Sequence, residues 1–168
     1  MAYKNLREFI SELEKRGELK RISAEVDSEL EITEITDRVT KAEGPALLFE
    51  RVKGFSFTLA INLFGTWNRM TLALGVNRLD DVADRIRTMI PKHAPAGIME
   101  KIAMIPKLID LARSSPVRVK NAPCQEVIDE NPSLSKFPIM KCWPGDAGRY
   151  ITFPGVVTKD AETGSYNL

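Results

Sequence analysis

The spacing of apolar residues along the chain predicts a series of amphipathic helices in its first two thirds. Apolar positions recur every three or four residues, the period of one helix face, over residues 5–16, 30–41, 79–90 and 97–113, and a shorter helix is expected over residues 66–73. Asn5 and Glu8 form a pattern similar to a capping box, and Gly17 marks the end of the first helix. Pro106 is expected to kink the helix over residues 97–113 or to split it in two.

Nearly continuous apolar runs between these helices predict a small sheet. Residues 46–50 and 57–62 are expected to form strands on either side of a turn at Lys53 and Gly54, and residues 18–22 a further short strand. Because the two longer runs are apolar at successive positions, rather than at every second one, the sheet is expected to be covered on both faces.

The pattern changes after Ser114, Ser115 and Pro116, where short strands and turns replace the helices. Proline then occurs at positions 123, 132, 138, 144 and 154, which is typical of a turn-rich segment. The predicted fold class is therefore α+β, with an N-terminal α/β domain over residues 1–115 and the beginning of a β domain over residues 116–168.

The last residues predict a hairpin with unequal arms. Residues 151–159 are rich in β-branched and aromatic side chains and indicate a strand, and residues 160–164 have the composition of a turn. Only residues 165–168 follow, so most of the first arm would lack a partner, which folded sheets avoid. From this pattern we expect the sequence to be interrupted within a β domain.

Composition sets limits on the function. The chain has 168 residues, a net charge of +1, 43% apolar residues and 28% charged residues, as is ordinary for a globular protein. The balanced charge gives no reason to expect nucleic acid as a partner. No apolar run approaches the roughly 20 residues of a transmembrane helix, and the start of the chain leads directly into a helix rather than a signal peptide. We therefore expect a cytoplasmic protein with Cys124 and Cys142 as reduced thiols.

Few side chains in the sequence offer chemistry. His93 is the only histidine and lies between prolines, where a solvated loop residue is the ordinary interpretation. Arg149 follows a glycine-rich turn and is either an anion ligand or a surface residue, and the sequence leaves both open. Asn167 is ordinarily a surface residue, although its amide oxygen suits a hard cation such as Mg²⁺ or Mn²⁺.

Several short motifs together resemble the N-terminal part of the UbiD family of prenylated-FMN-dependent decarboxylases, which are 3-octaprenyl-4-hydroxybenzoate carboxy-lyase-like. Residues 44–50, Asn62-Leu63-Phe64-Gly65 and Arg69 are similar to the family's N-terminal domain. Residues 122–125, 142–152 and 167–168 are similar to the opening of its flavin-binding split β-barrel. Each piece is short, but their order and spacing extend over essentially the whole chain.

The resemblance implies non-oxidative decarboxylation of aromatic or α,β-unsaturated carboxylic acids by a homo-oligomer that binds prenylated FMN, Mn²⁺ or Mg²⁺, and K⁺. Asn167 matches the family's metal-binding Asn beside the cofactor phosphate, and Thr152 matches a position that lines the cofactor pocket. No catalytic residue is carried over to this chain, because the family's metal-binding His and Glu and its Glu-Arg-Glu set belong further along. His93 precedes the motif region and does not match the metal-binding His.

Three functions remain open at this point. The first is the N-terminal portion of a UbiD-like decarboxylase, in which case the isolated chain should be inactive and bind no cofactor stably. The alternative is a non-catalytic short subunit or assembly module that completes a partner's barrel. A third is an unrelated split-barrel flavin protein, against which the match in the N-terminal domain argues.

Overall fold

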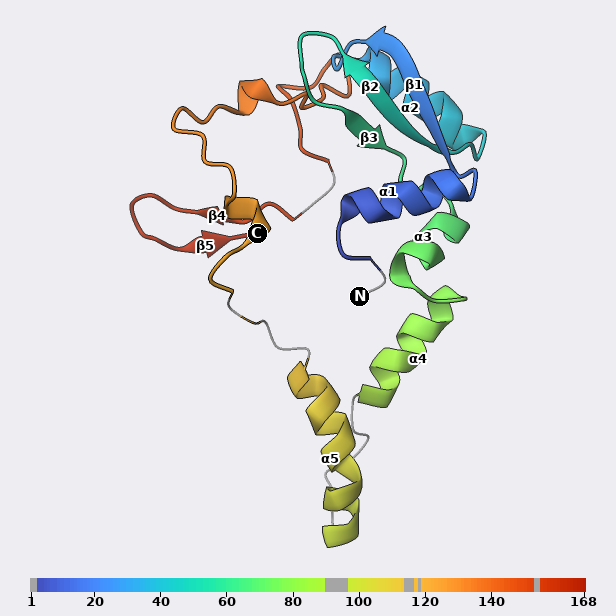
Figure 1. Ribbon diagram of the computed structural model, residues 1–168, viewed down its shortest axis with the longest axis vertical. Coiled ribbons are helices and arrows are strands. Elements are labelled where there is room, and N and C mark those ends of the chain that lie inside the picture. Colours follow the sequence, from blue (N-terminus) through green and yellow to red (C-terminus); the bar gives the residue numbers. More distant parts are fainter. Residues whose placement is uncertain (1–2, 90–96, 114–116, 118, 153–154) are drawn as a thin grey trace. The chain divides into compact units, whose positions relative to one another are not determined.

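The computed structural model describes residues 3–89, 97–113, 117, 119–152 and 155–168. They form two compact units, which we call the sheet unit (residues 5–69 and 133–168) and the helical unit (residues 1–4 and 70–132). Helices and small sheets are both present (Figure 1), so the predicted α+β class is confirmed. His93 lies outside the described residues.

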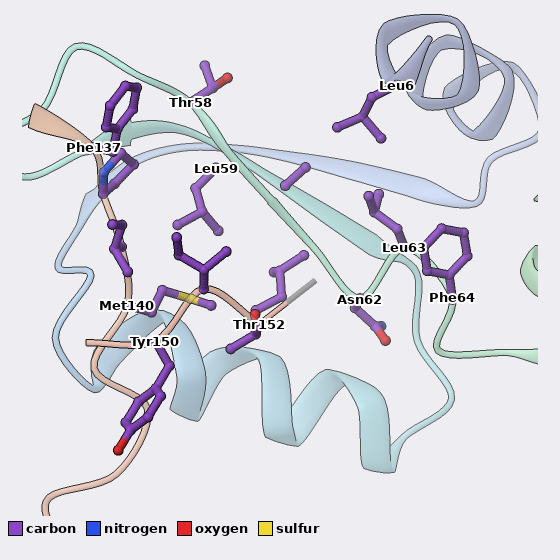
Figure 2. Close-up of a pocket in the computed structure, with 15 residues that line it drawn as sticks. Leu6, Thr58, Leu59, Asn62, Leu63, Phe64, Phe137, Met140, Tyr150 and Thr152 are labelled. Atoms are coloured by element: carbon purple, nitrogen blue, oxygen red, sulfur yellow. The ribbon is translucent and has the colours of Figure 1, made fainter. Parts of the chain in front are cut away.

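The first part of the sheet unit alternates helices and strands. Its elements follow in the order α1 (Leu6–Lys15), β1 (Leu19–Val26), α2 (Glu31–Lys41), β2 (Ala46–Val52) and β3 (Leu59–Ile61). The strands form one sheet of order β1-β2-β3, in which β1 is parallel to β2 and β3 is antiparallel to β2. Since β1 and β2 are parallel, the chain must cross over between them, and α2 makes this connection along one face of the sheet (Figure 2).

The central strand β2 contributes more buried apolar residues than any other described element. Its first four residues, Ala46 to Phe49, are all buried, so both faces of this strand are covered, as the continuous apolar run predicts. Leu47 and Phe49 belong to a cluster with Ile32 of α2 and with Met140 from the far end of the chain. Successive residues of a strand point to opposite faces, so Ala46 and Leu48 face away from that cluster.

Helix α1 begins and ends as the sequence predicts. The Asn5 side-chain oxygen accepts a hydrogen bond from the Glu8 N–H at 3.0 Å, which satisfies one of the free donors at the helix start. Gly17 has a φ of +71°, a conformation that disfavours any residue with a Cβ atom. The helix buries Phe9 and Leu13, and the Phe9 ring stacks on Phe64 with 5.7 Å between centroids.

The segment after β3 is shaped by Asn62 and Gly65. Asn62 has a φ of +59°, and its side-chain amide donates to the carbonyl of Pro45 at 3.0 Å. A Cβ atom at Gly65 would lie 1.8 Å from the Asn62 side-chain oxygen, so only glycine fits there. Helix α3 (Trp67–Leu74) follows, and the Thr66 hydroxyl accepts from the Arg69 N–H at 3.3 Å, which confirms the predicted helix start.

Arg69 is the largest fully buried side chain, with 1% of its surface exposed. Its Nη1 donates to Glu18 Oε2 at 3.0 Å, and Asn68 donates to the other Glu18 oxygen at 2.9 Å. A buried guanidinium is costly without a counter-charge, so Glu18 stabilises the charge that Arg69 brings into the interior.

The C-terminal part of the sheet unit has little regular structure. A short 3₁₀ helix, η2 (Leu134–Lys136), precedes the segment that reaches the core, and a hairpin of β4 (Thr158–Lys159) and β5 (Tyr166–Asn167) follows. The strand predicted over residues 151–159 is therefore wrong in extent, because its described residues are paired only at 158 and 159. The physical reason is that residues 165–168 offer too few partners for a longer ladder.

The helical unit contains the rest of α3, then α4 (Leu79–Met89), α5 (Ile98–Arg113) and the 3₁₀ helix η1 (Pro123–Gln125). Helix α5 continues through Pro106 as one helix, so of the two expected outcomes, a kink or a split, the split does not occur. Across the part of the chain that the structure describes, none of the helices combines the length and apolar character needed to cross a membrane.

Removing the counter-charge of Arg69 should destabilise the sheet unit strongly. We expect Glu18→Ala to lower the free energy of unfolding by about 3 kcal/mol, because a buried cation is left unpaired. Glu50→Ala is the matched control, since it removes an exposed contact to Arg21 and should cost about 1 kcal/mol or less. Denaturant unfolding measures both values, and equal losses would contradict the role given to Glu18.

Candidate functional site

An apolar cavity lies beside the last strand of the sheet, within the sheet unit (Figure 2). Its volume is about 450 Å³, within the range of small-molecule pockets. Three segments supply its walls, together with Leu6 of α1: residues 58–64, residues 137–140 and residues 150–152. The cavity thus joins β3 to segments that lie about 80 residues away in the sequence.

The walls of this cavity are almost entirely hydrocarbon. None of the described residues that line it is charged, and the polar ones are Thr58, Asn62, Tyr150 and Thr152. The Asn62 amide is already engaged with the carbonyl of Pro45. The cavity can therefore accept an apolar body and a few hydrogen bonds, but its described lining offers no counter-charge to a phosphate or a carboxylate.

Backbone hydrogen bonds hold the segment around Lys141 against the turn that precedes α2. The Lys141 N–H donates to the Ser28 carbonyl at 3.2 Å, and the Lys141 carbonyl accepts from the Leu30 N–H at 3.0 Å. Leu30 has a φ of +67° and a ψ of −39°, a sparsely populated conformation that costs a leucine about 1 kcal/mol or more. The hydrogen bond to Lys141 helps to stabilise that conformation.

One further backbone bond extends this arrangement to the cavity wall. The Tyr150 N–H donates to the Met140 carbonyl at 2.9 Å, so residues 150–152 run beside residues 139–140. Met140 is 7% exposed and packs in the core with Leu47 and Phe49. The core therefore anchors the wall that carries Thr152.

The Arg149 side chain fastens the same segment to the turn. Its Nη1 donates to the Ser28 hydroxyl at 3.0 Å and to the Ile139 carbonyl at 2.7 Å, and its Nη2 lies 3.4 Å from Glu29 Oε2. Ser28 is 1% exposed, so its hydroxyl would lose a buried partner without Arg149. Arg149 is exposed, as the surface-residue interpretation predicts, and these contacts add a positioning role to it.

The turn is also stabilised electrostatically through Asp27. The Asp27 carboxylate accepts a hydrogen bond from the Glu29 N–H at 2.9 Å, and this bond lowers the pKa of Asp27. The Lys53 ammonium, 3.3 Å from the same carboxylate, and the charge of Arg149 act in the same direction. Asp27 is therefore ionised at neutral pH and keeps the cations Lys53 and Arg149 near the turn.

The two predicted site residues lie in different parts of the sheet unit. Thr152 lines the cavity, whereas Asn167 lies in β5 opposite Thr158 and is not among the described lining residues. Asn167 is exposed, and its side-chain oxygen accepts from the N–H of Leu168 at 3.0 Å. The structure therefore does not bring Thr152 and Asn167 into one pocket.

The carboxylate of Asp160 stabilises the turn between β4 and β5, the strand that contains Asn167. Asp160 Oδ1 accepts hydrogen bonds from the N–H groups of Thr163, at 2.6 Å, and Glu162, at 3.0 Å, and from the Thr163 hydroxyl at 2.9 Å. These bonds lower the pKa of Asp160, that of the Thr163 N–H being the strongest cause. The ionised carboxylate thus stabilises the turn between β4 and β5.

The described residues do not on their own fit a metal or a flavin phosphate. No group of three or more His, Cys, Asp or Glu side chains that could hold a metal ion occurs among them. Asn167 offers one neutral amide oxygen, which suits Mg²⁺ or Mn²⁺ but is far short of a coordination shell. The cavity adds no charged group to it.

Sequence reasoning missed the residues that position the cavity wall. Ser28, Met140 and Lys141 are central to it, but none belongs to a pattern with a helical or strand period that would single it out. Only the position of Arg149 after a glycine-rich turn drew attention, and its partners are up to 121 residues away.

Two families of protein domains match the sequence, one after the other. Residues 10–88 match the 3-octaprenyl-4-hydroxybenzoate carboxy-lyase N-terminal domain, and residues 115–168 match the 3-octaprenyl-4-hydroxybenzoate carboxy-lyase Rift-related domain.

Two curated relatives are similar over nearly the whole chain. An uncharacterized protein of Archaeoglobus fulgidus is 49% identical over 167 residues, which is 99% of this chain and 34% of the relative. An uncharacterized protein of Aquifex aeolicus is 44% identical over 169 residues, which is 99% of this chain and 35% of the relative. The chain thus spans about a third of the length of the curated relatives it matches.

Solved structures of UbiD-class enzymes have a similar fold. HmfF from Pelotomaculum thermopropionicum, in complex with FMN, matches with a TM-score of 0.66 and 29% identity over 96% of this chain and 32% of its own. Vanillic acid decarboxylase from Sedimentibacter hydroxybenzoicus, in open form, matches with a TM-score of 0.68 and 28% identity over 94% of this chain and 32% of its own.

Replacing Arg149 should loosen the cavity wall without unfolding the sheet. We expect Arg149→Met to speed hydrogen exchange of residues 139–152 by about tenfold, since three hydrogen bonds to the turn and the segment are lost together. Arg149→Lys should have an intermediate effect, because one ammonium group cannot reproduce the fork of the guanidinium. Arg78→Met, at an exposed position, is the control. An unchanged exchange rate in Arg149→Met would contradict the positioning role.

Acid should release the turn that carries Asn167. Because the folded-state pKa of Asp160 is lowered, its contribution to stability is present above the unfolded pKa of about 4 and is lost as the pH falls through the folded value. We expect the amide resonances of Glu162 and Thr163 to be constant from pH 7 to about pH 5 and to move at roughly pH 4 and below. Asp160→Asn should abolish this titration, and Glu162→Gln should keep it; a response that survives Asp160→Asn would refute the assignment.

Proposed function

This chain belongs to the UbiD family, in its N-terminal part, and from that membership we propose that it forms the N-terminal portion of a decarboxylase that acts on aromatic or α,β-unsaturated carboxylic acids. The observation that carries the proposal is the succession of the two family matches, the N-terminal domain over residues 10–88 and the Rift-related domain over residues 115–168. Fold similarity to HmfF and to vanillic acid decarboxylase over at least 94% of the chain supports it.

The domain arrangement is part of the proposal. Residues 1–115 form the N-terminal domain, and residues 116–168 open a flavin-binding split β-barrel. The two family matches lie on either side of this division, which supports it. The strands of the barrel that would pair with the hairpin of β4 and β5 are supplied from outside these residues.

Prenylated FMN is the proposed cofactor, together with Mn²⁺ or Mg²⁺ and K⁺. Related structures support a flavin, since HmfF is in complex with FMN and an evolved dimeric form of HmfF is in complex with prFMN. When bound, prenylated FMN supplies the electron sink for cleavage of the bond to the carboxylate.

Asn167 gives one amide oxygen to the divalent metal, and Thr152 lines the flavin site. The exposed position of Asn167 on the β4–β5 hairpin supports its role, because its oxygen exchanges only the local bond to the Leu168 N–H for the metal. Thr152 contributes a hydroxyl on an otherwise apolar wall that the core holds through Met140. The other metal ligands and the groups that handle the substrate come from outside these residues.

Two consequences follow from this division of the site. The isolated chain is inactive, because a single neutral donor holds neither the metal nor the cofactor phosphate. The active form is a homo-oligomer of the whole protein, and the evolved dimeric form of HmfF supports an assembled state in this family.

A chimeric protein tests the proposal directly. Residues 1–168 replace the matched third of the Archaeoglobus fulgidus relative, with which they are 49% identical. The chimera is loaded with prenylated FMN and Mn²⁺, and retained flavin, retained Mn²⁺ and carbon dioxide release from a panel of aromatic acids are measured. We expect all three for the chimera and none for the 168-residue chain, and Asn167→Ala should lower retained Mn²⁺ by about tenfold or more.

The control substitution is Asn77→Ala, which removes a side-chain amide in the helical unit, a unit that contains none of the proposed ligands. Unchanged Mn²⁺ in the Asn167→Ala chimera would exclude the metal role. Carbon dioxide release by the isolated chain would show that it is not inactive alone. If the unmodified relative releases carbon dioxide and the chimera does not, the chain is a non-catalytic module.

A further inference from the structure

Strand β3 has one edge that pairs with no strand of the described chain. The sheet order is β1-β2-β3, so β3 pairs with β2 along one edge only. Its residues Leu59, Ala60 and Ile61 are half-buried rather than exposed. Unpaired backbone N–H and C=O groups on a half-buried strand edge can form hydrogen bonds with another strand, and proteins ordinarily cover such an edge or pair it.

The apolar cavity runs along this edge and reaches both faces of the strand. Cross-strand partners share a face, so Leu59 and Ile61 lie on the face of Phe49 and Leu47, where Met140 also packs. Ala60, opposite Leu48, lies on the other face. All of the β3 residues line the cavity, with Met140 among its other walls (Figure 2).

The unpaired edge of β3 and the apolar cavity beside it together define the chemistry of a segment that could bind there. Walls on both faces of β3 suit apolar side chains that point alternately to the two sides, which is the pattern of a β-strand. The strand edge suits backbone N–H and C=O groups spaced like its own. None of the described lining residues is charged, so a flavin phosphate or a carboxylate would lie there without a counter-ion.

We propose that the open edge of β3 accepts a further strand, apolar on both faces, from the part of the protein that the relatives carry outside the matched third. The relatives are about three times as long as this chain, so they have further chain, outside the matched third, that could supply such a strand. The inference uses the family membership but not the decarboxylase activity. It assigns the cavity to completion of the sheet, with Thr152 at the border of the added strand.

A single extended segment fits this place better than a second copy of the chain. The cavity is closed opposite β3 by residues 137–140 and 150–152, which hydrogen bonds and the core hold in place. The edge of another complete sheet would bring its own β2, α2 and cavity wall with it. The cavity, at about 450 Å³, has too little volume for these additional elements.

Hydrogen exchange in the chimera tests the proposal. The exchange of peptides that cover residues 57–63 is compared between the 168-residue chain and the chimera with the Archaeoglobus fulgidus relative, over a range of protein concentrations. We expect exchange at β3 to be at least about tenfold slower in the chimera, because the added strand satisfies its outer edge. Peptides from β2 are the internal control and should exchange slowly in both proteins. This readout does not depend on flavin, metal or activity.

A pair of substitutions locates the effect. Ala60→Glu places a charge at the edge and should return β3 in the chimera to the exchange rate of the isolated chain, whereas Ser56→Glu, in the exposed segment before β3, should not. Slow exchange of β2 peptides in each variant shows that the sheet is still folded. Equal exchange of β3 in chain and chimera would overturn the proposal, as would protection of the isolated chain that rises with concentration, which would identify a second copy as the occupant.

Discussion

The C-terminal half of the sheet unit depends on one turn, residues 27–30. Lys141 pairs with this turn through two backbone hydrogen bonds, and Arg149 binds its buried serine and Glu29. Closing a loop of more than a hundred residues costs conformational entropy that no single exposed contact offsets. The bonds act together with the burial of Met140, and from that anchor follow the position of the cavity wall and of Thr152.

Features decided by neighbours in the sequence could be predicted from it. The cap at Asn5, the helix start at Thr66 and the burial of both faces of β2 each depend on residues within a few positions or on one apolar run. Their energies are local, so a pattern of residue types is enough to identify them. The α+β class follows from the sum of such elements.

Features decided by distant partners could not be predicted. β1 extends to Val26, beyond the predicted end at residue 22, because β2 provides partners for Glu25 and Val26 after an irregularity in the register. β3 is only three residues long because its ladder with β2 ends there. Arg149 shows the same limit for the candidate site, since its partners Ser28 and Glu29 lie in another part of the sequence. The composition of a segment shows which side chains it has, but not which distant groups form their hydrogen bonds and ion pairs.

The candidate site differs from a self-sufficient active site in how its chemistry is divided. Its apolar wall is well anchored, while its proposed metal ligand is one amide on a short hairpin. The described residues add no group of three or more His, Cys, Asp or Glu side chains that could hold a metal ion. Such a division is physically reasonable if the charged groups come from elsewhere in a larger protein, because buried charges are stable only once their partners are present.

The two proposals, a cofactor site at Thr152 and a strand at β3, are then thermodynamically linked. Thr152 is one of the residues that line the cavity along β3, so a strand in the cavity and a cofactor at Thr152 would contact the same stretch of wall, residues 150–152. If binding of the strand makes residues 150–152 more rigid, the entropy cost of binding the cofactor falls. Binding of the cofactor would lower the cost of binding the strand by the same amount. In such an arrangement the site would acquire its cofactor affinity only as the sheet is completed, so assembly of the whole protein and formation of its flavin site would be one cooperative event.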